Sequence, residues 1–282
     1  MMACSQLIYP ITQFGKMGKV HSIFDRSFNI IVNGQLIHIG CYKQYISSFG
    51  TYVDRDSYER IKPYLQVGNN VRVSDGSLTF YSTKGVYKLD IEIEPIDLKV
   101  HQIILEDSEL AMRNLTYLRE SINKNINISQ IGLENNADLQ IVFSKLSSSK
   151  EVEWEEIVHY LIGRGKGLTP SGDDIMVAYL FTMLLYCPQR ALALCKTMLN
   201  MKLSTTDISL AYLIACTKGF VSSPIYRLYE TLKTQSQPED VEKAIENIKM
   251  IGHTSGKDMA FGIRLGVNYF WNNLNIRREK NG

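Results

Sequence analysis

The sequence predicts an α+β protein, with a β-rich N-terminal sheet or small barrel that would pack on a helical C-terminal part. Two observations lead to this fold class. Up to about residue 104, short β-branched and aromatic segments alternate with turn dipeptides, which is typical of hairpins. From about residue 106 onward, apolar residues recur at helical spacing instead. We therefore expect a β-rich domain over 1–104 and a helical domain over 105–282.

The strands of the first domain are predicted from its turns. Asn33-Gly34 favours a two-residue hairpin turn, and it separates the strand-like segments 21–32 and 35–41. Asp75-Gly76 and Lys84-Gly85 mark two further turns. The strands around these turns are expected at 70–74, 77–83 and 86–94, and one short helix is expected at 57–65.

Helical periodicity then defines the second domain. Apolar residues share one face of a helix predicted over 108–124. A helix over 152–162 should end at Gly163, since glycine commonly follows a helix C-terminus. The helices predicted after it are 172–186, 189–201, 206–220, 224–235, 238–250 and 256–275.

Composition narrows the class of protein. Apolar residues make up 45% of the chain and charged residues 21%, with a net charge of +2, as in an ordinary globular protein. No basic stripe suggests nucleic acid, and the longest apolar run, 175–187, is too short to span a membrane. The start of the chain lacks the apolar core of a signal peptide. Five cysteines without a CxxC pair favour reduced thiols, so we expect a cytoplasmic protein.

The least ordinary segment is 163–174, which reads Gly-Arg-Gly-Lys-Gly-Leu-Thr-Pro-Ser-Gly-Asp-Asp. Its alternating glycines allow a ligand to approach the backbone closely. Ser171 and Asp174 have the spacing of a capping box, so a helix should begin there. Free N–H groups, hydroxyls and carboxylates at a helix N-terminus suit an anion, or a metal ion held against one. The segment lacks the Lys-Ser/Thr ending of a nucleotide-binding P-loop and does not follow a strand, so no nucleotide cofactor is indicated.

The pattern Ser-x-x-Asp occurs three times before a helical run, at 171–174, 204–207 and 255–258. Each helix cap contributes about 1 kcal/mol, so capping and a functional role explain the second occurrence equally well. The first and third occurrences share more, because both have Ser-Gly-x-Asp and an upstream glycine. For these two segments we favour a shared functional site over capping.

The residues of this predicted site fall into two groups. Asp173, Asp174, His253 and Asp258 are the predicted catalytic residues. The predicted substrate-binding residues are Gly165, Lys166, Gly167, Thr169, Ser171, Gly172, Thr254, Ser255 and Gly256. Asp173 and Asp174 are also the predicted ligands of a Mg²⁺ ion, since hard oxygen donors suit magnesium. Alternatively one of the two acts as a general base, and the sequence leaves both roles open.

Two histidines allow more than one interpretation. His253 lies in a loop of small residues beside a predicted helix start, where it could donate a hydrogen bond or act as an acid or base. A structural role, bonding nearby carbonyls, is the alternative. The same choice applies to His21 in the β-rich domain.

Segment 163–174 resembles the signature of the AllH family of bacterial proteins. The similarity spans most of the chain and continues at Thr205, Thr206, Ser209, Gly219, 252–258 and, in outline, at His21, Asn29 and Gly34. It adds Thr205 and Thr206 to the predicted substrate-binding residues. Arg164 and Lys166 stand where many members have a neutral residue, and Thr254 where serine is common. These departures leave the glycines, hydroxyls and acids intact but change the expected charge preference.

The resemblance implies a link to oxamate carbamoyltransferase in anaerobic allantoin and purine degradation. AllH-like proteins occur there with FdrA-like and AllG-like partners, and the reaction converts oxalurate and phosphate to oxamate and carbamoyl phosphate. We therefore expect a transferase, or a subunit of one, acting on a small carboxylate, carbamoyl or phosphate compound. The alternative is a non-catalytic metabolite-binding or regulatory subunit of a multi-protein complex.

Overall fold

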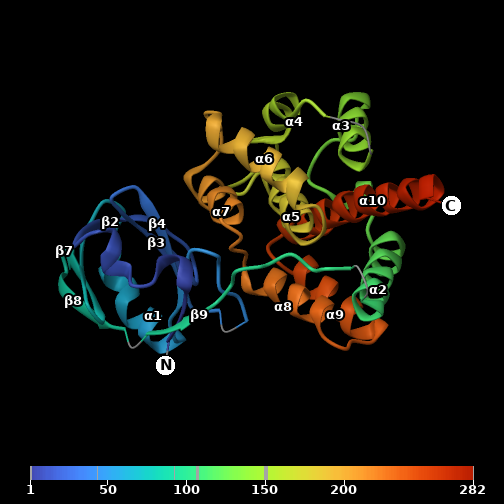
Figure 1. The fold of residues 1–282 in the computed structure, drawn as a ribbon. Helices are drawn as coiled ribbons and strands as arrows, with labels where there is room; N and C mark the ends of the chain where they lie inside the picture. Colours follow the sequence, from blue (N-terminus) through green and yellow to red (C-terminus); the bar gives the residue numbers. More distant parts are fainter. Residues whose placement is uncertain (1, 43, 92, 106–107, 149–151, 282) are drawn as a thin grey trace. The chain divides into compact units, whose positions relative to one another are not determined.

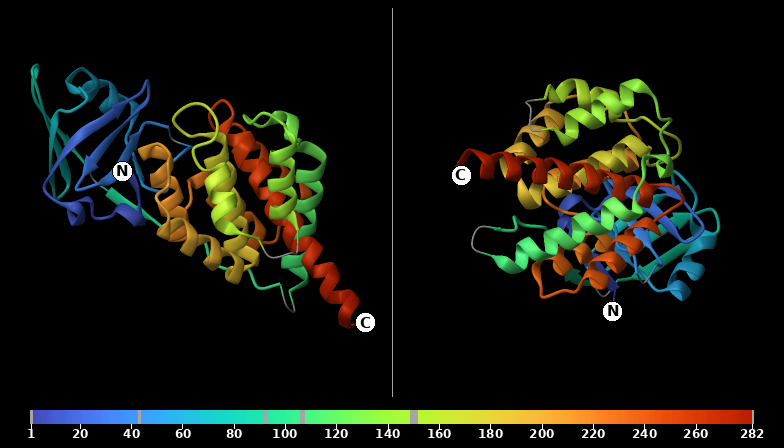
Figure 2. Two further views of the ribbon diagram at one scale, coloured as in Figure 1. Left: turned by 90° about the horizontal axis from the view of Figure 1, so that it is seen from above. Right: turned by 90° about the vertical axis from the view of Figure 1, so that its right-hand side faces the viewer.

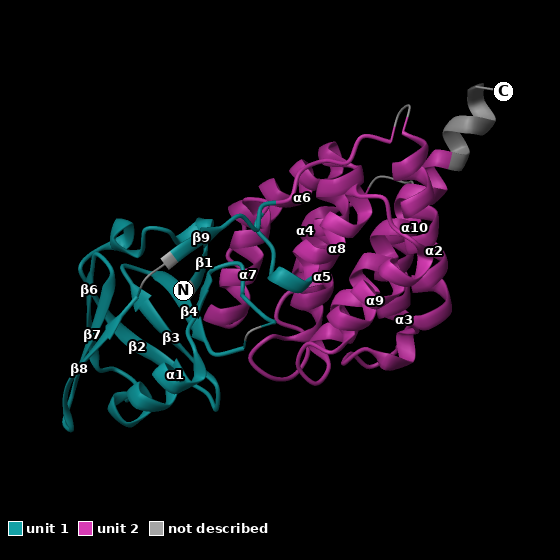
Figure 3. Ribbon diagram, turned by 90° about the horizontal axis from the view of Figure 1, so that it is seen from below, with its two compact units in different colours: residues 1–99, 220–224 teal, residues 100–219, 225–282 magenta. Residues whose placement is uncertain are grey.

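The computed structural model describes residues 2–42, 44–91, 93–105, 108–148 and 152–281. It divides into two compact units, shown in two colours in Figure 3. Unit 1 comprises Met1–Lys99 and Phe220–Pro224, and unit 2 comprises Val100–Gly219 and Ile225–Gly282. Unit 1 contains the sheet and unit 2 contains most of the helices (Figure 1), which confirms the predicted α+β class.

Unit 1 is built on a curled sheet of nine strands in the order β8-β7-β6-β2-β3-β4-β5-β1-β9, counted over the described residues. The strands are β1 (Met2–Ser5), β2 (Met17–Ile23), β3 (Ser27–Val32), β4 (Gln35–Gly40), β5 (Gly50–Tyr52), β6 (Asn70–Ser74), β7 (Ser77–Ser82), β8 (Gly85–Asp90) and β9 (Ile93–Ile96). Phe28, Ile30 and Phe80 are fully buried on this sheet. The ring of Tyr58 from helix α1 (Arg55–Ile61) stacks on Phe28, which contributes to the core of the unit.

Both predicted hairpins are confirmed. Asn33 and Gly34 adopt positive φ values of 46° and 81°, as a two-residue turn between β3 and β4 requires. The predicted strand 21–32 is wrong in one respect, because the chain turns after β2 and the amide of Phe24 donates to the carbonyl of Ser27. The predicted strand 86–94 is likewise divided between β8 and β9, and the short strands β1 and β5 were not predicted.

The helices of the second part follow their predicted positions closely, with one addition. They are α2 (Glu109–Asn125), α3 (Ala137–Ser147), α4 (Trp154–Leu161), α5 (Ser171–Tyr186), α6 (Pro188–Asn200), α7 (Asp207–Thr217), α8 (Ser223–Lys233), α9 (Pro238–Lys249) and α10 (Ser255–Asn281). The addition is α3, which buries Leu139, Val142 and Leu146 at helical spacing and is capped by Asn136. Both signals were present in the sequence.

Helices α5 and α10 form the central pair of unit 2, and α10 also packs on α2, α3 and α9 (Figure 2). A Cβ atom added at Gly262 would overlap the backbone at Ile175, and one added at Gly266 would overlap Thr182. Residue numbers increase together along this contact, so the two helices run parallel. Their N-termini therefore lie at the same end, and two partial positive charges meet there.

No helix among the described ranges is long and apolar enough to cross a membrane.

Candidate functional site

Three helix starts, those of α5, α7 and α10, meet in unit 2. The hydroxyls of Thr169 and Ser255 are 2.9 Å apart and join the segments before α5 and α10. Thr206, at the start of α7, donates from its hydroxyl to the carbonyl of Leu168 at 2.5 Å. The structure thus brings together the three segments that carry Ser-x-x-Asp.

The serines of these segments do not cap their helices, so the predicted capping boxes are wrong. Ser171 is the first residue of α5 and follows Pro170, which has no side chain able to accept a hydrogen bond. At α10, the carbonyl of Thr254 accepts the amides of Lys257 and Asp258. At α7 the cap is Thr206 and not Ser204, because the Thr206 hydroxyl accepts the amide of Ser209.

Serine is therefore the first helical residue, glycine the second and aspartate the fourth in both α5 and α10. A Cβ atom at Gly172 would overlap the carbonyl oxygen of Leu161, in the last turn of α4. A Cβ atom at Gly256 would overlap that of Ile248, near the end of α9. The shared glycine thus allows each helix start to pack against the end of the preceding helix.

Asp173 holds the glycine-rich loop to α7. Its Oδ1 accepts the amide of Gly163 at 2.7 Å, and its Oδ2 accepts the hydroxyl of Thr205. Burial raises the pKa of Asp173, while these two donors and the hydroxyl of Ser209 lower it in part. Because both oxygens already have protein donors, Asp173 fits a positioning role better than the predicted role of metal ligand or base.

Asp174 and Asp258 differ from Asp173, because each keeps one oxygen without a donor. The Oδ2 atoms of both are enclosed, and neither has a hydrogen-bond partner among the described residues. The hydroxyl of Ser255 in α10 lowers the pKa of Asp174, and the hydroxyl of Ser171 in α5 lowers the pKa of Asp258. Each helix start thus contributes a hydroxyl to the carboxyl group of the other. A buried acceptor without a donor costs about 1–3 kcal/mol, so this pair is a candidate for ligand or proton binding.

The electrostatics of the pair follow from burial. Burial raises the pKa of Asp174 well above its ordinary range, the Ser255 hydroxyl opposes this, and the charges of Asp258 and Asp173 raise it further. Burial also raises the pKa of Asp258, and the Gly132 amide, the Ser171 hydroxyl and Lys257 lower it in part. Burial and the neighbouring negative charges therefore both favour the protonated form of Asp174.

The loop before α5 offers backbone donors and a cation. Residues 164–168 are exposed, and Gly163, Gly165 and Gly167 have φ values of 77°, 126° and 89°. Within the described part of unit 2, the amides of 165–169 have no protein acceptor, whereas the amide of Gly172 donates to the Arg164 carbonyl at 2.8 Å. Lys166 is exposed beside these amides.

His253 and Thr254 were also predicted as site residues, and both lie in or next to the turn before α10. His253 is exposed in the turn before α10, and no hydrogen bond joins it to the carboxyl pair. Thr254 contributes its backbone carbonyl to the start of α10. Across the ranges that the structure describes, no group of three or more His, Cys, Asp or Glu residues is placed to hold a metal ion.

Gly132 belongs to the site but was not predicted. Its amide donates to Oδ1 of Asp258 at 2.8 Å, from a loop 126 residues earlier in the chain. A Cβ atom here would overlap the Ser171 hydroxyl, so a larger residue would displace that hydroxyl. No local pattern around Gly132 could have shown this role, because it depends entirely on the long-range approach of α10.

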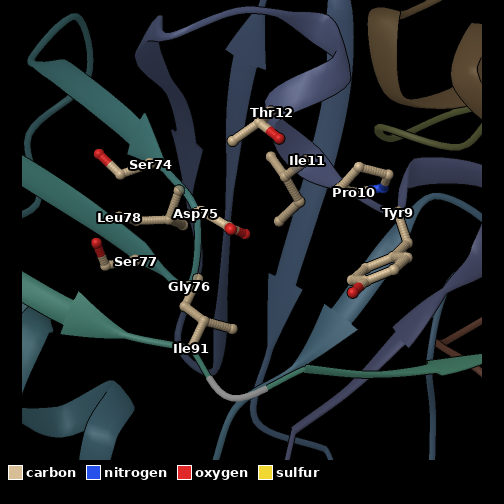
Figure 4. A pocket seen from close by; sticks show the side chains of 10 residues that line it. All are labelled: Tyr9, Pro10, Ile11, Thr12, Ser74, Asp75, Gly76, Ser77, Leu78 and Ile91. Atoms are coloured by element: carbon tan, nitrogen blue, oxygen red, sulfur yellow. The ribbon is translucent and has the colours of Figure 1, made fainter.

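A small hollow in unit 1 is a weaker candidate. It measures about 80 Å³ and lies beside the turn between β6 and β7 (Figure 4). Asp75 is the single charged side chain among the residues labelled there, with Thr12 and Tyr9 nearby. The hollow lacks the several buried titratable groups found at the start of α5.

Comparison with known families follows the same division of the chain. A family model described as oxamate carbamoyltransferase subunit AllH matches residues 161–267, which include all three helix starts of the site. A second model, described as the AllH family N-terminal domain, matches residues 1–96. No solved structure matches the chain.

Proposed function

The chain belongs to the AllH family, and on this premise we propose that it binds the small substrate of a carbamoyltransferase at the three helix starts. The single observation that supports this most directly is the buried pair Asp174 and Asp258, each with one carboxyl oxygen that lacks a donor. The proposed reaction is carbamoyl transfer between oxalurate and phosphate. FdrA-like and AllG-like proteins are the proposed partner subunits.

The anionic part of the substrate would bind at the loop before α5. Within the residues that the structure describes, the amides of 165–169 have no protein acceptor, and Lys166 adds a positive charge beside them. Two parallel helices add the partial positive charges of their N-termini. Because Oδ2 of Asp174 and Oδ2 of Asp258 are enclosed, the residues around them would have to move for a substrate to reach them.

The carboxyl pair would then supply the proton that the reaction needs. A phosphate oxygen attacks the carbamoyl carbon of oxalurate, the bond from that carbon to the inner nitrogen breaks, and the nitrogen takes a proton. The products are oxamate and carbamoyl phosphate. Asp174 suits the role of proton donor because burial and the charge of Asp258 raise its pKa and so favour its protonated form.

A Mg²⁺ ion would be held by Asp258 through its free Oδ2, because Asp174 holds the proton and Asp173 has no oxygen to spare. The ion would supply charge neutralisation for bound phosphate. We expect calorimetric titration with MgCl₂ in the presence of phosphate to show binding to the wild type. Asp258→Asn should weaken it by about tenfold or more, and the control Glu239→Gln, which changes an exposed carboxylate at the start of α9, should not. Equal loss in both variants, or no binding to the wild type, would contradict this assignment.

The proposed function is tested by binding and turnover measured separately. We expect the isolated chain to bind oxamate or phosphate in a calorimeter, and carbamoyl transfer to appear when the FdrA-like and AllG-like proteins are added. In that assembly Asp258→Asn should abolish turnover. If turnover instead persists and only its response to metabolites changes, the chain is a regulatory subunit. If the chain bound neither oxamate nor phosphate, the proposed site would be contradicted.

A further inference from the structure

A cavity of about 620 Å³ lies within unit 2 at the C-terminal end of α5. Its walls come from the segment 102–105, from α2, from the junction of α5 with α6, and from α10. Tyr186, at this end of α5, and Asp174, at the other, are 12 residues apart, so about 18 Å of helix separates the cavity from the carboxyl pair. Sites for small molecules usually measure about 300–1,000 Å³. The cavity is therefore large enough for a ligand of its own.

Much of the wall is apolar. The rings of Phe270 and Tyr186 lie with their centroids 5.4 Å apart. The amide of Ile103 donates to the carbonyl of Leu185 at 2.9 Å, which holds the segment 102–105 across the end of α5. The next residue, Ile104, lines the cavity and is 67% exposed. An aromatic ring in the cavity would cover this apolar surface and remove it from water.

The hydroxyl of Tyr186 is a buried polar group without a partner. Tyr186 lines the cavity and is 7% exposed. No described residue makes a hydrogen bond with its hydroxyl. Burial raises the pKa of Tyr186, and no hydrogen bond opposes this. Because buried tyrosine hydroxyls usually have a hydrogen-bond partner, this one indicates a ligand that carries an acceptor.

Arg190 is the only charged side chain among the described residues that line the cavity. Its guanidinium lies 3.8 Å from the ring centroid of Tyr269 and 4.8 Å from that of Trp154. Its Nε donates to the hydroxyl of Tyr179 at 2.8 Å, and its Nη2 to the carbonyl of Lys145 at 3.5 Å. Within the described part of unit 2, Nη1 has no acceptor and no carboxylate pairs with the group. Arg190 is thus held in place with its positive charge unpaired.

The start of α6 adds backbone donors beside Arg190. Cys187 precedes this helix and makes no side-chain cap to it. The amide of Ala191 donates to the carbonyl of Cys187 at 3.0 Å, whereas the amides of Gln189 and Arg190 have no acceptor among the described residues. Free amides and a guanidinium together favour an anion. A carboxylate matches the single charge of Arg190, whereas a phosphate monoester would bring nearly two negative charges.

We propose that this cavity is a second ligand site, which binds a small aromatic carboxylate. The carboxylate pairs with Arg190 and accepts the hydroxyl of Tyr186, and the aromatic ring packs against Phe270 and Ile104. The site goes beyond the proposed carbamoyl transfer, because none of its residues belongs to the helix starts that bind the substrate.

The test is calorimetric titration of the full-length protein with 2-naphthoate and with 2-naphthamide, its uncharged counterpart. We expect 2-naphthoate to bind with a Kd below about 1 mM and 2-naphthamide to bind at least about tenfold more weakly. Saturating oxamate should leave the Kd of 2-naphthoate unchanged. Equal binding of the two probes, no binding of 2-naphthoate, or its displacement by oxamate would overturn the proposal.

Two variants locate the bound probe. Tyr186→Phe removes only a hydroxyl that has no protein partner, so it should weaken 2-naphthoate binding by about threefold to tenfold and leave the melting temperature unchanged. Arg190→Gln should weaken binding by about tenfold or more. The matched control is Arg119→Gln, because Arg119 also lies over an aromatic ring, 4.4 Å from the centroid of Trp271, but does not line the cavity.

We expect Arg119→Gln to bind 2-naphthoate as the wild type does. Unchanged binding in both Tyr186→Phe and Arg190→Gln would place the probe elsewhere and contradict the proposal. These results are independent of the carboxyl pair, because oxamate binding to the same variants is measured separately and should stay at the wild-type value.

Discussion

Asp174→Asn is expected to abolish carbamoyl transfer in the assembled enzyme, with turnover lowered by about 10²–10⁴-fold. The substitution keeps the size and shape of the side chain but removes the titratable proton of the buried carboxyl group. The free energy of unfolding should stay within about 1–2 kcal/mol of the wild type. Turnover with the partner subunits and thermal unfolding of the isolated chain together measure the two effects.

The stability of Asp174→Asn relative to the wild type should change with pH in one predictable direction. Burial raises the folded-state pKa of Asp174 above its unfolded value, so the folded protein binds more protons between these two values. Wild-type stability therefore falls as pH rises through that interval. Asparagine does not titrate, so the stability of the variant relative to the wild type should increase as the pH rises above 3.8, the ordinary pKa of an aspartate. Asp173→Asn should show the same sign, because burial raises the pKa of Asp173 as well.

Loss of function together with loss of folding at every pH would contradict the assignment of Asp174. A variant that folds normally and retains turnover would contradict it as well. The informative outcome is a folded, inactive protein that becomes relatively more stable at alkaline pH.

Gly256→Ala is expected to destabilise unit 2 by about 1–3 kcal/mol, despite the higher helix propensity of alanine. The added Cβ atom would overlap the carbonyl oxygen of Ile248, and backbone atoms cannot move aside as a side chain can. The melting temperature should fall by about 4–10 °C. Gly172→Ala should behave in the same way, because its Cβ atom would overlap the carbonyl oxygen of Leu161.

Lys257→Ala is the control, since it changes an exposed residue in the same helical turn and should alter stability by about 0.5 kcal/mol or less. Thermal unfolding monitored by circular dichroism measures all three variants. If the glycine variants were as stable as the wild type and had lost only ligand binding, the glycines would serve ligand approach and not helix packing.

Much of the fold could be predicted because its signals are local. The Asn33-Gly34 turn follows from the preference of two residues, and the apolar face of α2 follows from a periodicity over a few residues. The same local reasoning was wrong about Ser171, which has capping-box spacing but stands inside the helix. Capping depends on the backbone angle at which the chain enters a helix, and Pro170 places that entry one residue earlier.

The sequence by itself determined the fold class, the order of the elements after the glycine-rich loop, and the relationship between the segments at 171–174 and 255–258. Only the tertiary structure decided which carboxylates have donors. Asp173 and Asp174 are neighbours in sequence, yet Gly163 and Thr205 satisfy the first, while Asp174 faces α10 with an oxygen left unpaired. Hydrogen bonding in a core depends on residues that meet through chain folding, as Gly132 meets Asp258. The spacing of residues along the sequence does not predict such long-range contacts.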